Sequence, residues 1–89
     1  MSKEIIIKPL TDLKSGQEGI IKSVQGGHGA VRRLEAMGIR PGIKIRKSSA
    51  QFMRGPIGVK AGNTSLALGY GMAQKIMVAV PAGRQEVNK

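Results

Sequence analysis

Apolar residues occur along this chain in short runs, separated by glycine, proline and charged residues. Runs of this length, bounded by turn-forming residues, are typical of β-strands. The first run is the isoleucine triplet at 5–7, which ends before Pro9 and which we interpret as a first strand or as a tethering arm. A turn is expected next, with Leu10 and Leu13 directed inward. The beginning of the chain therefore favours a β protein.

The best-defined strand signal is the alternation of apolar and basic residues at 43–47. Alternation with a period of two indicates a half-buried strand, and here it places Lys44 and Arg46 on the outer face. A glycine–asparagine pair at 62–63 is typical of a two-residue turn between antiparallel strands. The remaining strands are expected at 18–25, 57–61, 64–68 and 77–80.

The apolar period changes in residues 31–37. There Val31, Leu34 and Met37 are three residues apart, with charged residues between them. This spacing predicts one or two turns of amphipathic helix. Gly38 follows directly and is well placed to end the helix, because glycine adopts the left-handed conformation at little cost. So short a helix is unstable alone and is expected to dock on the rest of the protein.

The elements together predict a small, nearly closed SH3-like barrel. About five strands and one or two short helices are expected, the second helix being a single turn at 72–76. Closure of a small sheet removes exposed strand edges that would otherwise pair with other chains. We expect one domain over residues 1–81 and a flexible C-terminal tail over 82–89.

Composition argues against an enzyme and against a metal protein. The chain of 89 residues has no cysteine, one histidine and five carboxylates that are spread along its length. No nucleophile with a paired base is evident, so no catalytic residue is expected. No set of ligands with metal-binding spacing is evident either, so no metal site and no cofactor are expected. The absence of a long apolar segment predicts a cytoplasmic protein that does not insert into a membrane.

The charge is the strongest compositional signal. Fifteen Lys and Arg against five Asp and Glu give a net charge of +10, which suits nucleic acid, an anionic membrane surface or an acidic protein face. The cations available for phosphate contacts are Lys22, Arg32, Arg33, Arg40, Lys44, Arg46, Lys47, Arg54 and Lys60. Single-strand binders usually add aromatic platforms, and Phe52 and Tyr70 are the two aromatic residues here. The aromatic platform is thin, and it is the cations that keep RNA binding through phosphate contacts as the alternative function.

An ordered set of motifs resembles a known family. Its most specific part runs from 32 to 42 and reads Arg-Arg-Leu-Glu-Ala-Met-Gly-Ile-Arg-Pro-Gly. Gly-Pro at 55–56 and Ala-Leu-Gly at 67–69 follow in order. On these motifs, roughly residues 8–80 resemble the FeoA family, the small cytosolic component of bacterial ferrous iron uptake. The motif residues that we interpret as structural are Leu34, Met37, Gly38, Pro41, Gly42, Gly55, Pro56 and Gly69.

The resemblance implies an SH3-like barrel with an inserted helix, in agreement with the strand pattern. It also implies a non-enzymatic accessory role and a partner, the membrane ferrous iron permease with its cytosolic GTP-binding domain. A transient contact with ferrous iron stays open. The surface that we expect to meet the partner comprises Arg32, Arg33, Arg40, Lys44, Arg46 and Arg54. The alternative for each of these side chains is an ordinary solvated surface residue.

Overall fold

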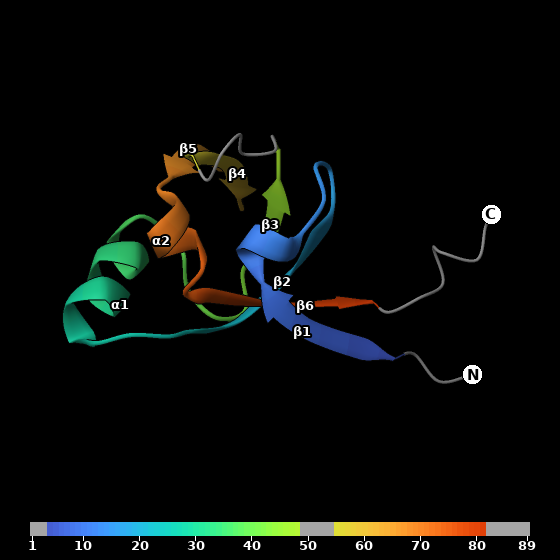
Figure 1. The fold of residues 1–89 in the computed structure, drawn as a ribbon. Coiled ribbons are helices and arrows are strands. Elements are labelled where there is room, and N and C mark those ends of the chain that lie inside the picture. Colours follow the sequence, from blue (N-terminus) through green and yellow to red (C-terminus); the bar gives the residue numbers. More distant parts are fainter. Residues whose placement is uncertain (1–3, 49–54, 82–89) are drawn as a thin grey trace.

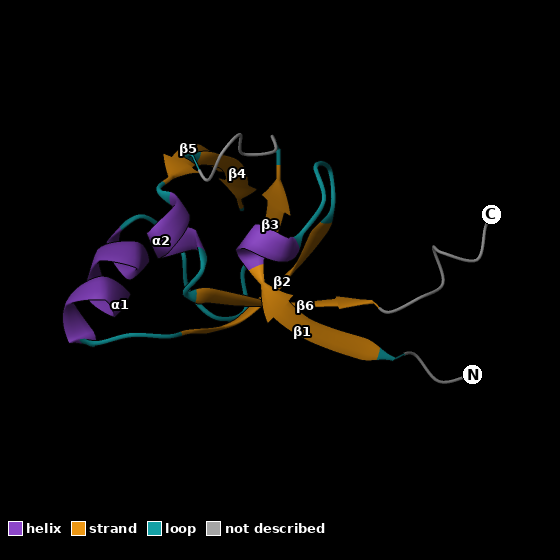
Figure 2. Cartoon of the chain, viewed as in Figure 1, coloured by secondary structure: helices purple, strands orange, loops and turns teal. Residues whose placement is uncertain are grey.

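The protein folds as a six-stranded antiparallel sheet with two short α-helices and one 3-10 turn (Figures 1 and 2). The computed structural model describes residues 4–48 and 55–81, and all counts refer to these residues. The elements are β1 (Ile5–Pro9), η1 (Leu10–Asp12), β2 (Glu18–Val24), α1 (His28–Ala36), β3 (Lys44–Lys47), β4 (Ile57–Ala61), β5 (Thr64–Leu68), α2 (Tyr70–Ala73) and β6 (Ile76–Pro81).

The mainly β prediction is confirmed, and the sequence pattern located most strands to within two residues. The triplet at 5–7 belongs to a strand, β1, which raises the count from about five to six. The turn at 62–63 joins β4 to β5, and Gly62 has the positive φ of +60° that such a turn needs. The tail expected at 82–89 lies outside the described residues, and the domain extent of 1–81 stays a prediction.

Both helices begin earlier than the apolar spacing predicted. Helix α1 starts at His28, not at Val31, because the glycines around His28 do not prevent helical geometry once Gly27 occupies the N-cap. Helix α2 starts at Tyr70, directly after Gly69. Neither helix, nor any other in the part of the chain that the structure describes, is long and apolar enough to cross a bilayer.

The strand order in the sheet is β1-β6-β2-β3-β4-β5, and every neighbouring pair is antiparallel. The last strand in the chain, β6, therefore lies between the first two. No pairing joins β1 to β5 among the described residues, so the strongly bent sheet keeps two edges. In Figure 1, β1 and β6 run side by side on the side of the molecule opposite to α1.

The core lies inside the bent sheet and is built from aliphatic side chains. Strands β4 and β6 contribute at every second position, as a one-sided strand must. The turn η1 adds Leu10, α1 adds Leu34 and α2 adds Ala73, all fully buried. The buried set is Leu10, Leu13, Ile21, Leu34, Ile39, Ile45, Ile57, Val59, Ala61, Leu68, Ala73, Ile76, Val78 and Val80.

Gly19 lies where β2 passes close to the backbone and side chains of β6. A Cβ atom at this position would lie 2.5 Å from the carbonyl oxygen of Ala79 and 2.7 Å from Cγ1 of both Val78 and Val80. These distances are too short for any carbon side chain. Glycine is therefore required here by space, since its φ is not in the left-handed region.

Candidate partner-binding surface

Helix α1 projects from the barrel and exposes most of its surface (Figure 2). Its nine residues follow Gly27, and Leu34 is the one residue among them that is fully buried. Arg32 and Arg33 are both exposed, as the position of Leu34 predicted. The helix thus reaches the core through a single anchoring side chain and presents the rest to solvent.

The C-terminal end of α1 is fixed by backbone hydrogen bonds. The N–H of Gly38 donates to the carbonyl oxygen of Glu35 at 3.0 Å, and the N–H of Ile39 donates to that of Leu34 at 2.9 Å. With Gly38 at φ +91°, this is a Schellman motif, in which a left-handed residue closes the helix. Leu34 and Ile39 are both fully buried. They occupy the two positions whose apolar contact usually accompanies this motif.

The turn after α1 leads the chain into the sheet. Arg40, Pro41 and Gly42 are exposed, and Gly42 has a φ of +94°. The N–H of Gly42 donates to the carbonyl oxygen of Ile21 at 2.8 Å, which ties the turn to β2. The exposed surface formed by α1 and residues 40–42 is called the helix surface below.

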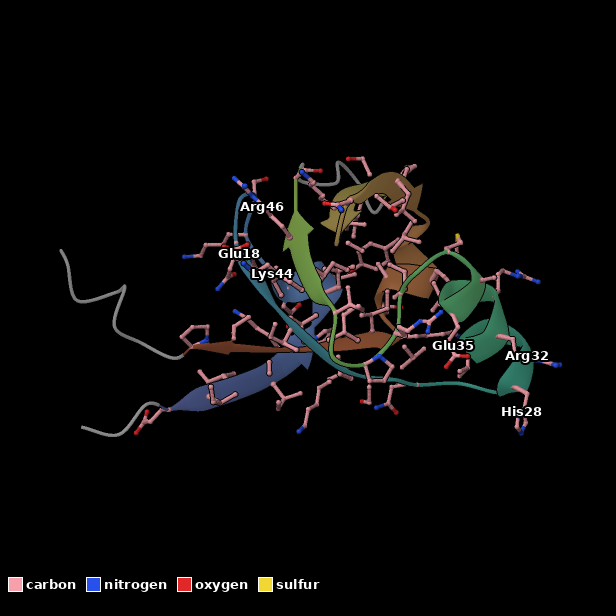
Figure 3. The ribbon with its side chains drawn as sticks, turned by 180° about the vertical axis from the view of Figure 1, so that it is seen from behind. Glu18, His28, Arg32, Glu35, Lys44 and Arg46 are labelled. Carbon is pink, nitrogen blue, oxygen red and sulfur yellow. The ribbon has the colours of Figure 1, made fainter. Side chains whose placement is uncertain are left out.

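Within the described residues, the arginines of the helix surface have no carboxylate partner. Among the described residues, the one ion pair within 4.0 Å joins Lys44 to Glu18, so neither Arg32 nor Arg33 is paired. In Figure 3, Arg32 and His28 extend outward from α1 into solvent. Unpaired, exposed guanidinium groups remain available to an acidic partner.

A second basic group lies on the outer face of β3. The Nζ of Lys44 lies 3.9 Å from Oε1 of Glu18, with side chains that are 66% and 51% exposed, so the pair contributes little to stability. Arg46 faces Glu18 across β2 and Lys60 across β4. Two cations directly opposite each other on a sheet repel. These residues, Lys44, Arg46 and Lys60, are called the strand surface below.

The predicted site residues thus fall into two separate groups. Figure 3 shows Arg32 on α1 at one end of the molecule, and Lys44 with Arg46 on β3, away from this helix. Arg40 belongs to the turn that follows α1. Arg54 lies outside the described residues. The structure therefore does not gather the five described residues of this set into one continuous face.

The motif residues interpreted as structural occupy turns and boundaries of elements. Met37 is half-buried and packs against the core. Gly55 and Pro56 directly precede β4. Gly69 is the N-cap of α2, with an extended backbone. Their positions fit the structural interpretation, which the geometry of Gly38 and Gly42 supports most directly.

Lys47 is not available for phosphate contact, which corrects the expectation from sequence. Its side chain is 3% exposed, and its Nζ donates to the carbonyl oxygens of Leu13 at 2.6 Å and of Thr11 at 3.2 Å. Burial lowers the pKa of this ammonium, against a smaller opposite effect of Asp12. Its inward position in the alternating pattern of β3 was the signal that could have revealed this role.

Potential metal ligands do not cluster within 4–48 and 55–81. No group of three or more His, Cys, Asp or Glu side chains comes together there. His28 is exposed at the start of α1. The basic surfaces therefore remain the features of the described structure with evident chemistry for binding.

The comparison with protein families places this geometry in a known group. The model of the FeoA domain family matches residues 8–80. A protein of Methanocaldococcus jannaschii named "Putative Fe(2+) transport protein A" is 40% identical over 70 residues, which are 79% of this chain and 83% of the relative.

Solved structures agree with the family match. The crystal structure of an iron uptake regulatory protein, FeoA, superposes with a TM-score of 0.77 at 34% identity, covering 82% of this chain and 96% of that one. FeoA of Stenotrophomonas maltophilia, solved with zinc and described as a prokaryotic SH3 domain protein, superposes with a TM-score of 0.69 at 27% identity. It covers 79% of this chain and 87% of that one. The predicted SH3-like fold is thereby confirmed.

Proposed function

Because this chain belongs to the FeoA family of ferrous iron transport accessory proteins, we propose that it acts by binding the cytosolic part of a membrane ferrous iron permease. The contact is made by the helix surface, and the protein contributes binding and no catalysis of its own. The role is that of an accessory subunit which assists or regulates the transporter.

The observation that carries the proposal is the exposure of α1. A helix that is anchored by Leu34 alone leaves most of its surface free, and the unpaired Arg32 and Arg33 give that surface a positive charge. An acidic patch on the partner would supply the missing carboxylates. Exposed ion pairs contribute about 0.2–1 kcal/mol each, so charge mainly raises the association rate and selects the partner.

The test is capture of the detergent-solubilised permease by the tagged protein at physiological salt. The double variant Arg32→Glu/Arg33→Glu turns two attractions into two repulsions, so its affinity for the permease should fall on the order of ten-fold. The matched control is Lys44→Glu/Arg46→Glu, which makes the same change of charge on the strand surface. The control should retain capture. Both variants should stay folded because all four side chains are exposed, and the control should melt slightly below the wild type because it places two carboxylates beside Glu18.

Three results would contradict the proposal in different ways. Equal capture by the wild type and the Arg32/Arg33 variant would reject the helix surface. Loss of capture by the control alone would move the contact to the strand surface. A matched RNA pool serves as competitor in the same experiment, and retention of RNA without the permease would favour the nucleic-acid alternative.

A further inference from the structure

Among the described residues, β1 forms an unpaired outer edge of the sheet. Within the described residues β1 pairs with β6 and with no other strand, and it ends the sheet. Three consecutive isoleucines favour a strand. Their side chains are nevertheless not buried, since Ile5, Ile6 and Ile7 are 58%, 47% and 43% exposed. Every second residue of an edge strand directs its N–H and C=O groups away from the sheet, toward a further strand.

Natural edge strands are normally protected by charge, proline, a bulge or a cover. In β1 the charged and proline residues, Lys8 and Pro9, come at its end, and no register shift interrupts its pairing with β6. The opposite edge, β5, differs because it begins with the polar Thr64 and Ser65. Of the two edges, β1 is therefore the one suited to pairing with another chain.

The sequence of β1 is complementary to itself. If two copies of the strand pair antiparallel about Ile6, Ile5 of one copy lies opposite Ile7 of the other. In the same register Glu4 lies opposite Lys8, twice, because a two-fold axis repeats every contact. Residues directly opposite share a face, so the two acidic and two basic side chains meet as cross-strand pairs and the isoleucines meet as apolar pairs.

Glu4 and Lys8 are free to make these contacts. Neither takes part in an ion pair within 4.0 Å in the described part of the protein. They are four residues apart along an extended chain, a separation of about 13 Å, which is too far for them to pair within one copy. A partner strand in the stated register satisfies both charges at once.

We propose that this protein forms a homodimer in which the β1 strands of two copies pair antiparallel about Ile6, so that the two sheets become one. The contact is short and therefore gives a concentration-dependent dimer. The dimer contact lies on elements other than those of the helix surface. An experiment that disproves the dimer therefore leaves the proposed permease contact unaffected, and the reverse also holds.

The experiment is sedimentation equilibrium over a range of protein concentrations. Glu4→Lys and Lys8→Glu each place like charges opposite one another in a homodimer, so each should raise the dimer dissociation constant about ten-fold or more. In an equimolar mixture, the Glu4→Lys chain and the Lys8→Glu chain are complementary at both contacts. The mixture should therefore dimerise about as well as the wild type, and so should the double variant Glu4→Lys/Lys8→Glu.

The mixture also separates the dimer from a folding defect, because an unfolded chain would not be restored by mixing. Lys14→Glu, an exposed change of the same charge in the loop before β2, is the matched control and should leave the wild-type dissociation constant unchanged. A wild type that stays monomeric at every concentration would overturn the proposal. So would a dimer that neither single variant weakens, because its interface would then lie elsewhere.

Discussion

Lys47 holds two parts of the chain together from inside the barrel. Its ammonium bonds the carbonyl oxygens of Thr11 and Leu13, at the turn between β1 and β2, while its backbone belongs to β3. Burial of the charge costs free energy, and the hydrogen bonds offset that cost. A residue type that composition assigns to the surface therefore serves as a cross-link.

Lys47→Met should lower the free energy of unfolding by about 1–3 kcal/mol at neutral pH, because the buried oxygen of Leu13 loses its donor. Lys47 has its ordinary pKa of 10.5 in the unfolded chain and a lower pKa in the fold. Between these two pH values the unfolded state binds more protons, so the wild type gains stability as the pH rises. Denaturant titrations should show the difference between wild type and variant widening toward pH 10.5. A constant or shrinking difference would contradict the buried, charged assignment.

Gly19 carries a second residue-scale prediction. Gly19→Ala would place a methyl carbon against the carbonyl oxygen of Ala79 and the side chains of Val78 and Val80, so β2 and β6 would have to separate. The expected loss is about 1–3 kcal/mol in the free energy of unfolding, as for other overpacked sites. Chemical denaturation measures it. Gly71→Ala, where a Cβ meets nothing within 4 Å, should change stability far less.

At the scale of the element, the two ends of α1 were not equally predictable from the sequence. Its C-terminal end was predictable, since Gly38 follows an apolar spacing of three and the structure closes the helix there. Its start was not, because glycines at 26, 27 and 29 are typical of a loop. Tertiary packing of Leu34 stabilises helical turns that local propensity alone would not.

Gly38→Val tests the closure of α1. A β-branched residue is strained at a φ of +91°, so the free energy of unfolding should fall by more than about 1 kcal/mol. The paired control is Gly29→Ala, which lies within α1 beside open space and should leave stability equal or slightly higher. Thermal melts of the two variants give the comparison. An unchanged melting temperature for Gly38→Val would show that the end of α1 does not need a glycine in the left-handed conformation.

At the scale of the whole molecule, the alternation of apolar and polar residues predicted where strands lie along the chain but not their order in the sheet. The alternation at 43–47 correctly placed Lys44 and Arg46 outside. Nothing in a strand's own pattern says which strand it pairs with, because pairing depends on contacts distant in sequence. For this reason the position of β6 between β1 and β2, and the open edge at β1, emerge only from the structure.

The same limit explains the outcome for the candidate site. Sequence reasoning identified exposed arginines beside Leu34, because helical spacing fixes neighbours within a turn. It also grouped Arg32 and Arg33 with Lys44 and Arg46, which are close in sequence but lie on β3, away from α1 (Figure 3). Distance between elements is set by the path of the turn at 40–42 and not by the number of residues in it.

The position of β6 has a consequence for how this chain acquires its structure. During synthesis from the N-terminus, residues 5–9 of β1 are made long before residues 77–81 of β6, with which they pair. Such contacts between sequence-distant residues slow the folding reaction, because a long loop must close before they form. Until β6 leaves the ribosome, β1 has no strand to pair with among the described residues. Folding is therefore expected to follow translation and to occur in a single cooperative step.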